Sequence, residues 1–538
     1  MSTAPLERRA APDAAELCYP SRRVPTMGKQ MVATSQPLAA QAGLAVLSSG
    51  GNAVDAAIAA AAVLTVVEPT MNGVGSDAFA LVWDGQRLHG LNGSGRAPAR
   101  FTLSRFRSRA TMPALGWDAV TVPGAVHAWA TLWGRFGSRP FAELLAPAIA
   151  YAREGFPVTP VTAALWRDQA PRFAGFREFA RVFLPDGRAP AAGQIFRNPD
   201  LARTLEEIAA TTGQSLYRGG LADRIAAAAA ADDGLLDAGD LADHRSTWVE
   251  PLALPFAGVV VHELPPNGQG LASLVALGIL ERLSADRHPI DGADAIHLQL
   301  EAMKLAFGVC RRQVADPEAM MIEPTALLEP AYLEAQARLV SLARVQVPDA
   351  RVAAEHGTVY LAAADASGRM VSFIQSNYLG FGSGVVVPGT GISLNNRAHG
   401  FSLERGHANE VGPAKRPFNT IIPGFLTRNG QPVMSFGVMG GNMQAQGHVQ
   451  MVTRLVDYQQ NPQAASDAPR WIVNTDYTVS FEERVPSTVL EDLTRRGHRI
   501  VGADVPMFGF GGAQLIHKLD DGYCAASDHR KDGCAIGF

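Results

Sequence analysis

The longest strongly apolar run in the chain extends from Ala56 to Val67. With Asn52 as its N-cap, this run predicts a helix over Ala53–Val67. The helix is apolar on nearly all sides, so we expect it to be buried between layers of the fold. It is too short to span a bilayer, which needs about 20 apolar residues.

A different pattern, with a period of two residues, appears in the second half of the chain. Val359–Leu361 favour a strand, Asp365–Gly368 favour a turn, and Arg369–Ser376 alternate as a return strand. Together they predict a β-hairpin. Thr358 opens its first strand, a position where a threonine is usually structural.

Helix-spaced apolar residues dominate the middle of the chain, whereas turn-punctuated strands dominate both ends. A strand is also predicted at Phe79–Trp83, after a glycine-rich loop, and the whole pattern indicates a mixed α and β protein. Helices are predicted at Gln41–Ser49, Glu143–Glu154, Leu201–Thr212, Leu221–Ala231, Gly270–Arg282, Ala293–Cys310 and, as a surface helix, Pro486–Arg496.

Composition excludes several classes of function. The net charge is −4 and no long basic run is present, so nucleic-acid binding is not indicated. The four cysteines are scattered, with no Cys-x-x-Cys pair and no His-Glu-x-x-His motif, so neither a metal nor another cofactor is expected. The glycine-rich loop follows a helix instead of preceding one, which argues against a phosphate-binding loop.

The N-terminal segment 1–27 is rich in proline, arginine and alanine, and we expect it to be poorly ordered. It lacks the apolar centre of a signal peptide. The expectation is a cytoplasmic protein without a membrane partner.

The predicted hairpin belongs to a longer series of motifs. His356-Gly357-Thr358, the hairpin, Asn377–Gly384 and Gly391–Asn396 resemble the start of the small subunit in the gamma-glutamyltransferase family. The resemblance covers roughly residues 28–538. It includes the segments Gly50–Ala57, Thr121–Gly124, Pro265–Gly270, Lys415–Pro417, Met439–Gly441, Ala468–Arg470 and Ala526–Asp528.

This resemblance implies a zymogen that cuts itself between Gly357 and Thr358. The products would be a large subunit, 28–357 after the N-terminal segment, and a small subunit, 358–538. The two would form one four-layer αββα sandwich, the N-terminal-nucleophile (Ntn) hydrolase fold. They would be each other's partners, and a homo-oligomer of the resulting heterodimer stays open.

The residues at the cut suit this chemistry. A threonine at a chain terminus supplies both a hydroxyl nucleophile and a base, because its α-amine titrates near ~7.7–8.0. Gly357 has no side chain, which lets its carbonyl approach Thr358.

Two further positions carry catalytic expectations with a plain structural alternative each. Ser376 lies where the family has a hydroxyl that bonds the nucleophile, but it also reads as an outward-facing strand serine. Gly440 and Gly441 resemble the family's oxyanion-hole pair, whose backbone N–H groups would stabilise negative charge, but they also fit a tight turn.

The positions that would bind the glutamyl group depart from the family. Ser94 stands where the family has an arginine, and Gly400 stands where it has an aspartate for the α-ammonium. Arg397 is read either as a new contact for an anion or as a solvated loop arginine. The predicted substrate-binding residues are Arg96, which lies two positions after Ser94, Tyr378, Arg397, Asn419 and Thr420.

The resulting hypothesis is a self-processing N-terminal-threonine amidohydrolase or acyltransferase that works through an acyl-enzyme. Its small-molecule substrate would be a gamma-glutamyl-like or glutaryl-like amide, with a carboxylate but no α-amine. The runs Asn377–Gly382 and Pro266–Gly270 look closer to the branch of the family with cephalosporin-acylase-like and uncharacterised amidase members. Two alternatives are a true glutathione hydrolase or gamma-glutamyltransferase of glutathione metabolism, and an uncut homologue that acts by binding.

Overall fold

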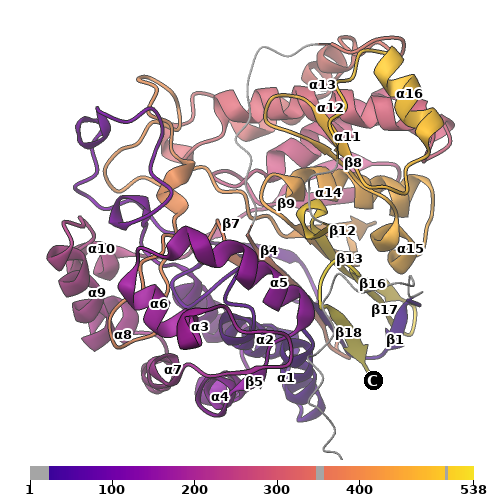
Figure 1. The fold of residues 1–538 in the computed structure, drawn as a ribbon. Coiled ribbons are helices and arrows are strands. Elements are labelled where there is room, and N and C mark those ends of the chain that lie inside the picture. Colours follow the sequence, from indigo (N-terminus) through magenta and orange to yellow (C-terminus); the bar gives the residue numbers. More distant parts are fainter. Residues whose placement is uncertain (1–22, 347–356, 503–506) are drawn as a thin grey trace, which may run out of the picture.

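The computed structural model describes residues 23–346, 357–502 and 507–538, which form a sandwich of two β-sheets covered by helices (Figure 1). Residues 1–22 of the predicted N-terminal segment and His356 of the predicted cleavage motif lie outside the described residues. Each sheet has seven strands, and all their pairings are antiparallel.

The first sheet joins both ends of the described chain with its centre, in the order β1-β17-β16-β13-β12-β9-β8. Its strands are β1 Thr26–Gly28, β8 Leu252–Phe256, β9 Val259–Glu263, β12 Gly424–Arg428, β13 Gln431–Met439, β16 Gly512–Leu519 and β17 Gly522–Ser527.

The second sheet holds the predicted hairpin at its centre, in the order β18-β2-β10-β11-β3-β4-β7. Its strands are β2 Met31–Thr34, β3 Asp77–Trp83, β4 Leu88–Gly93, β7 Thr247–Val249, β10 Val359–Ala364, β11 Met370–Ser376 and β18 Cys534–Gly537. Two short pairs, β5 Phe156–Pro157 with β6 Ile195–Phe196 and β14 Trp471–Val473 with β15 Val479–Phe481, stand apart.

The helices divide between the two outer faces, the indigo-to-magenta group on the second sheet and the pink-to-yellow group on the first (Figure 1). On the second sheet they are α1 Pro37–Ser48, α2 Ala53–Val67, α3 Ala125–Phe136, α4 Phe141–Glu154, α5 Pro160–Gln169, α6 Arg177–Phe183, α7 Pro199–Thr211, α8 Ser215–Arg218, α9 Gly220–Ala231 and α10 Ala238–Asp243. On the first sheet they are α11 Gly270–Leu283, α12 Ala293–Gln313, α13 Pro330–Ala337, α14 Met443–Val452, α15 Pro462–Asp467 and α16 Ser487–Arg495. The predicted αββα fold is confirmed.

Strand β10 shows how one segment serves two cores. Its side chains alternate between the sheets and the helices, as the period of a strand requires. Tyr360 and Ala362 pack between the two sheets, whereas Val359 and Leu361 pack against the helical layer of α2. Because both faces are covered, every residue of β10 is buried.

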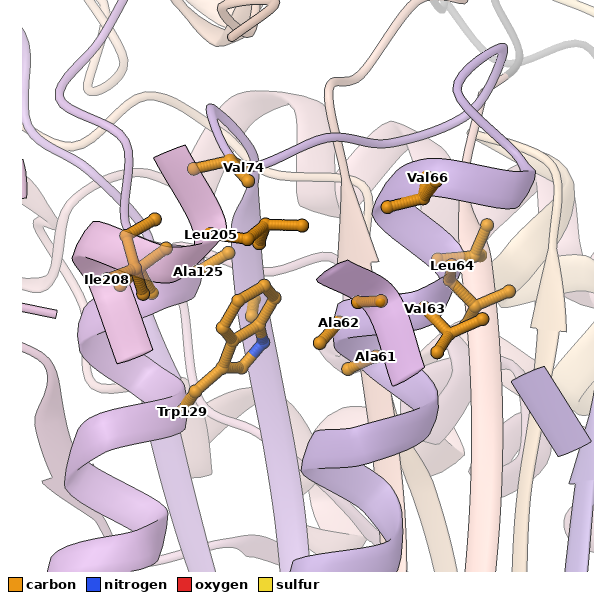
Figure 2. Close-up of a cluster of buried hydrophobic side chains, with 14 of the residues drawn as sticks. Ala61, Ala62, Val63, Leu64, Val66, Val74, Ala125, Trp129, Leu205 and Ile208 are labelled. Atoms are coloured by element: carbon orange, nitrogen blue, oxygen red, sulfur yellow. The ribbon is translucent and has the colours of Figure 1, made fainter. Parts of the chain in front are cut away.

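Helix α2 has the bounds that its sequence predicts, Ala53–Val67, and all of its residues are buried. Asn52 closes a capping box with Asp55 at its N-terminus. Figure 2 shows Ala61 and Ala62 of α2 near Trp129 of α3, where small side chains leave room for the indole ring. The amide of Gln375 in β11 bonds both the Trp129 indole N–H, at 3.2 Å, and the Ala61 carbonyl, at 2.9 Å.

Some boundaries differ from the predictions. Helix α1 begins at Pro37 and not at Gln41, because the Gln36 side chain accepts backbone N–H groups of the first turn. Thr26–Gly28 form the edge strand β1, although Thr26 and Met27 belong to the segment 1–27 that was predicted to be poorly ordered. The surface helix α16 lies within its predicted range. Among the described residues, no helix is long and apolar enough to cross a membrane.

Candidate active site

Thr358 lies immediately before β10, at the centre of the second sheet, and is 1% exposed. Its Oγ1 donates to the Gly357 carbonyl oxygen at 2.6 Å and lies 3.5 Å from Ser376 Oγ. A second hydrogen bond reaches Oγ1 from the other side, donated by Gln444 Nε2 at 3.0 Å. The hydroxyl is therefore held beside the peptide bond that the sequence predicts to be cut.

Ser376 ends β11, the strand paired with β10, which brings its hydroxyl opposite Thr358. Ser376 Oγ donates to the Gly357 carbonyl at 2.5 Å and accepts the Tyr378 N–H at 2.8 Å. Because the Tyr378 N–H can only donate, it directs the serine hydrogen toward Gly357. The side chain is fully buried, so the structure excludes the alternative of an outward-facing serine.

Gly357 makes a close approach that no other residue permits. A Cβ at this position would lie 2.5 Å from the Tyr378 carbonyl oxygen and 2.6 Å from the Gly380 nitrogen. Both neighbours are backbone atoms, which cannot move as a flexible side chain can. The absence of a side chain therefore keeps the Gly357 carbonyl under the two hydroxyl groups.

Gly440 and Gly441 connect the end of β13 to the start of α14. Their φ angles are 121° and 57°, values that favour glycine. The segment lies at the N-terminus of α14, where helix geometry concentrates positive partial charge. Gln269 Nε2 donates to the carbonyls of Gly441, at 2.8 Å, and Thr420, at 2.5 Å, and so ties this segment to the one that holds Thr420.

A buried arginine lies next to this cluster. The Arg397 guanidinium stacks over the Tyr378 ring, 4.4 Å from its centroid, and its Nη1 donates to Thr420 Oγ1 at 3.2 Å. Arg397 is fully buried, which excludes the solvated-loop alternative. Its Nε and Nη2 atoms have no hydrogen-bond partner among the residues that the structure describes. Burial lowers the pKa of Arg397 to about 10.

Asp77 is the carboxylate closest to this arginine, with its Oδ2 3.6 Å from Arg397 Nε. It also accepts the Gly95 N–H at 2.9 Å and Asn419 Nδ2 at 3.2 Å. Burial raises the pKa of Asp77 to about 6, although the positive charge of Arg397 opposes that rise. Such a perturbed pair in a cluster of polar groups is typical of a functional site.

Two predicted substrate contacts occupy other places. Asn419 uses its amide to hold Asp77 and to accept the Ile421 N–H at 3.1 Å, so its contacts position the Asp77 carboxylate and its own loop. Arg96 is not brought into the cluster: its guanidinium pairs with Asp316 at 3.0 Å and donates to the Ala414 carbonyl. Its predicted role in substrate binding has no support from this geometry.

Three residues of the cluster escaped the sequence analysis. Gln444 and Asp77 carry no motif of their own, and Gln269 lies in the Pro265–Gly270 motif but was given no role there. One indication of their importance is that they are polar residues within elements that are otherwise apolar or buried. Asp77 opens an apolar strand, and Gln444 is one of three glutamines in α14, a helix in which every residue is buried.

In the part of the chain that the structure describes, no group of three or more His, Cys, Asp or Glu could hold a metal ion.

Comparison with known proteins identifies the family. The gamma-glutamyltranspeptidase family model matches residues 39–538. The oxamate amidohydrolase proenzyme of Klebsiella pneumoniae is 36% identical, over 96% of this chain and 100% of its own. The glutathione hydrolase-like YwrD proenzyme of Bacillus subtilis is 33% identical, over 95% of this chain and 98% of its own.

A solved structure is similar over the whole fold. The cephalosporin acylase from Bacillus halodurans is 46% identical, with a TM-score of 0.92, over 98% of this chain and 99% of that chain. The chain therefore belongs to the gamma-glutamyltranspeptidase family of self-processing N-terminal-nucleophile amidohydrolases and acyltransferases.

Proposed function

We propose that the chain cuts itself between Gly357 and Thr358, and that the new N-terminal Thr358 hydrolyses an amide whose acyl group carries a carboxylate but no α-amine. The uncut site supports the first step. Thr358 Oγ1 attacks the Gly357 carbonyl carbon, and the carbonyl oxygen gains negative charge. Ser376 Oγ already donates to that oxygen and stabilises the charge. The scissile peptide nitrogen takes the Oγ1 proton as the C–N bond breaks, and water then hydrolyses the resulting ester, which leaves a carboxylate on Gly357 and an amine on Thr358.

The same hydroxyl then attacks the substrate. The α-amine takes the Oγ1 proton, Oγ1 bonds to the amide carbon, and the carbonyl oxygen becomes an oxyanion. Gly440 and Gly441, at the N-terminus of α14, are the proposed oxyanion hole. The leaving amine takes the proton as the C–N bond breaks. Water, or an acceptor amine in the transferase reaction, then releases the acyl group.

Arg397 is the observation that carries the substrate assignment. It is a fully buried cation with two donor atoms that have no hydrogen-bond partner among the described residues. A carboxylate is the group that a guanidinium binds best, through paired charge-assisted hydrogen bonds. Because Arg397 stacks on Tyr378 and Tyr378 bonds Ser376, a carboxylate on Arg397 would lie close to the nucleophile.

The surroundings of Gly400 argue against an α-ammonium. This is the position at which the family resemblance implies an aspartate for that group. A Cβ on Gly400 would lie 2.6 Å from the Phe418 carbonyl oxygen, so an acidic side chain does not fit on this backbone. The names of the oxamate and cephalosporin relatives agree with substrates other than a gamma-glutamyl compound.

The decisive experiment compares three anilides of matched length. We expect the glutaryl anilide to exceed both the γ-glutamyl anilide, which adds the α-ammonium, and the butyryl anilide, which lacks the carboxylate, by at least tenfold in kcat/KM. The paired variant Arg397→Met/Asp77→Asn removes both charges together and so leaves the net charge of the cluster unchanged. It should lower the glutaryl value about 10- to 100-fold, since hydrogen bonds to charged groups contribute ~1.5–3 kcal/mol.

The butyryl anilide is the internal control, because its turnover should be the same in the wild type and the paired variant. Thr358→Ala should be inactive on all three anilides. A marked preference for the γ-glutamyl anilide would refute the substrate assignment and favour the glutathione hydrolase alternative, which the name of the YwrD relative suggests.

A further inference from the structure

Gln444 reaches the nucleophile from the first turn of α14 and has no role in the scheme above. Its side chain is fully buried and bonds at both ends. Oε1 accepts the Ile422 N–H at 3.0 Å, and Nε2 lies 3.0 Å from Thr358 Oγ1. Because a backbone N–H can only donate, the Ile422 contact fixes which end of the amide is oxygen. Gln444 must therefore present an N–H to the Thr358 hydroxyl.

The hydrogen-bond partners of Oγ1 also indicate that Gln444 is the donor and Thr358 Oγ1 the acceptor. The Thr358 hydroxyl has one hydrogen, and its close acceptor is the Gly357 carbonyl at 2.6 Å. The lone pairs of Oγ1 are left for the Gln444 N–H. When Oγ1 loses its proton in either reaction, this donor stays in place and faces an oxygen that gains negative charge. Hydrogen bonds of that kind strengthen as the charge develops.

The donor is also held in a rigid frame. Gln444 lies only three residues after Gly441. The proposed oxyanion hole and the donor to the nucleophile are therefore at the same helix terminus, the N-terminus of α14. Gln269 ties the Gly441 and Thr420 carbonyls together across this terminus. Preorganised donors of this kind cost no rearrangement during the reaction.

We propose that Gln444 is a further catalytic residue, which holds Thr358 Oγ1 in its attacking position and stabilises it while its proton leaves. The Oγ1 proton moves to the α-amine in the mature enzyme and to the scissile peptide nitrogen in self-cleavage, and an Oγ1–C bond forms as the carbonyl electron pair moves onto oxygen. Gln444 gains and loses no atoms in this step. The inference rests on the proposed role of Thr358 as the nucleophile.

The substitution Gln444→Glu separates hydrogen-bond donation from packing. The introduced carboxyl has nearly the same shape and can still accept the Ile422 N–H, but when ionised it has no hydrogen to donate to Oγ1. We expect the rate of self-cleavage and kcat to fall about 10²-fold at pH 8, with little change in KM, since losing one such donor costs ~10²–10³. Self-cleavage is measured in the full chain on a denaturing gel, and kcat is measured per mole of mature Thr358 terminus.

The pH profile adds a readout that a structural role would not change. Burial raises the pKa of a carboxyl, and a protonated carboxyl can donate to Oγ1. The ratio of variant to wild-type rate should therefore rise as the pH falls from 8 to 5. Gln444→Met, which cannot donate at any pH, should show the low rate without this recovery.

Gln450 provides a matched control on the same helix. It is a buried glutamine whose amide, among the described residues, bonds the Trp471 backbone, at 3.1 Å to the carbonyl and 3.4 Å from the N–H. It lies six residues beyond Gln444, about 9 Å along the helix. Gln450→Glu should keep a near wild-type kcat with no recovery at low pH. A wild-type rate in Gln444→Glu at pH 8, or equal and pH-independent losses in the two variants, would overturn the inference. Activity in Thr358→Ala would instead overturn the proposed function itself.

Discussion

At the scale of single residues, the site contains a buried carboxylate whose ionisation costs stability. Burial raises the pKa of Asp77 to about 6, whereas a free aspartate titrates at 3.8. Since the folded pKa is raised, the folded state is favoured below about pH 4, and this contribution is lost as the pH rises through 6. The loss amounts to about 3 kcal/mol at neutral pH. We infer that the charge is retained because it balances Arg397 until an anionic substrate arrives.

This balance predicts a pH dependence of anion binding. As the pH falls from 8 to 5, Asp77 becomes neutral and the Arg397 charge is no longer compensated. The inhibition constant of 1-propanesulfonate, an anion that stays ionised throughout, should therefore tighten about tenfold. In Asp77→Asn the constant should be tight at every pH and nearly flat. A wild-type constant that is independent of pH would show that Asp77 does not control Arg397.

The residues around Thr358 show which spatial relations the sequence could predict and which it could not. Thr358, Ser376 and Gly357 could be placed because they adjoin the strands of one hairpin, whose register follows from the turn. Gln444 and Asp77 could not, because their partners lie in other elements: Gln444 Nε2 meets an oxygen eighty-six residues away in the chain. Arg96 failed for the opposite reason, since proximity in sequence to Ser94 says nothing about where a long side chain finds its carboxylate.

At the scale of elements, helix α2 supports the strand that carries Thr358. Strands β10 and β11 lie under α2, and the turn between them contacts its N-terminus. Asp365 Oδ2 in that turn accepts the Ala53 N–H at 2.9 Å. A carboxylate is favoured at this end of a helix, where free N–H groups and the helix dipole concentrate positive charge. The contact links the hairpin to the helical layer.

Removing this link should loosen the hairpin. We expect Asp365→Ala to lower the free energy of unfolding by about 1–2 kcal/mol, because it removes a helix-terminal acceptor and the turn bonds to Ser367. Urea denaturation in the uncut Thr358→Ala background measures it on a single chain. Asp521→Ala, in the exposed turn between β16 and β17, is the control and should change stability by less than about 0.5 kcal/mol. Equal effects in the two variants would contradict the proposed link.

The predicted start of a helix was correct where the sequence showed a typical N-cap residue, as at Asn52. It was wrong where the cap was an unusual residue, as at Gln36. The order of strands within the sheets could not be predicted from the sequence pattern. Strand β2 pairs with both β10 and β18, more than three hundred residues further along the chain. Apolar alternation marks a strand as half or fully buried, but it does not identify the partner strand. The layering of two sheets between helices was expected from the family resemblance, and the strand order was not predicted.

At the scale of the whole molecule, the proposed cut falls inside an interleaved pair of sheets, with the residues up to Gly357 as the proposed large subunit and 358–538 as the proposed small subunit. In the second sheet, β10 and β11 of the small subunit lie between β2 and β3 of the large subunit. In the first sheet, β17 and β12 of the small subunit pair with β1 and β9 of the large subunit. Both subunits therefore contribute to the core between the sheets.

This interleaving predicts that cleavage produces two pieces but one particle. A denaturing gel of the wild type should show fragments 1–357 and 358–538, the smaller beginning at Thr358, and Thr358→Ala should show one uncut chain. On gel filtration without denaturant, both fragments should elute together, because separating them would break backbone hydrogen bonds in both sheets and expose the core between them. With rising urea, the fragments should separate only over the range in which the sheets unfold, as followed by circular dichroism. Separation at a urea concentration that leaves the circular dichroism unchanged would mean that the sheets are not shared between the subunits, and the αββα body would then have to form within one of them.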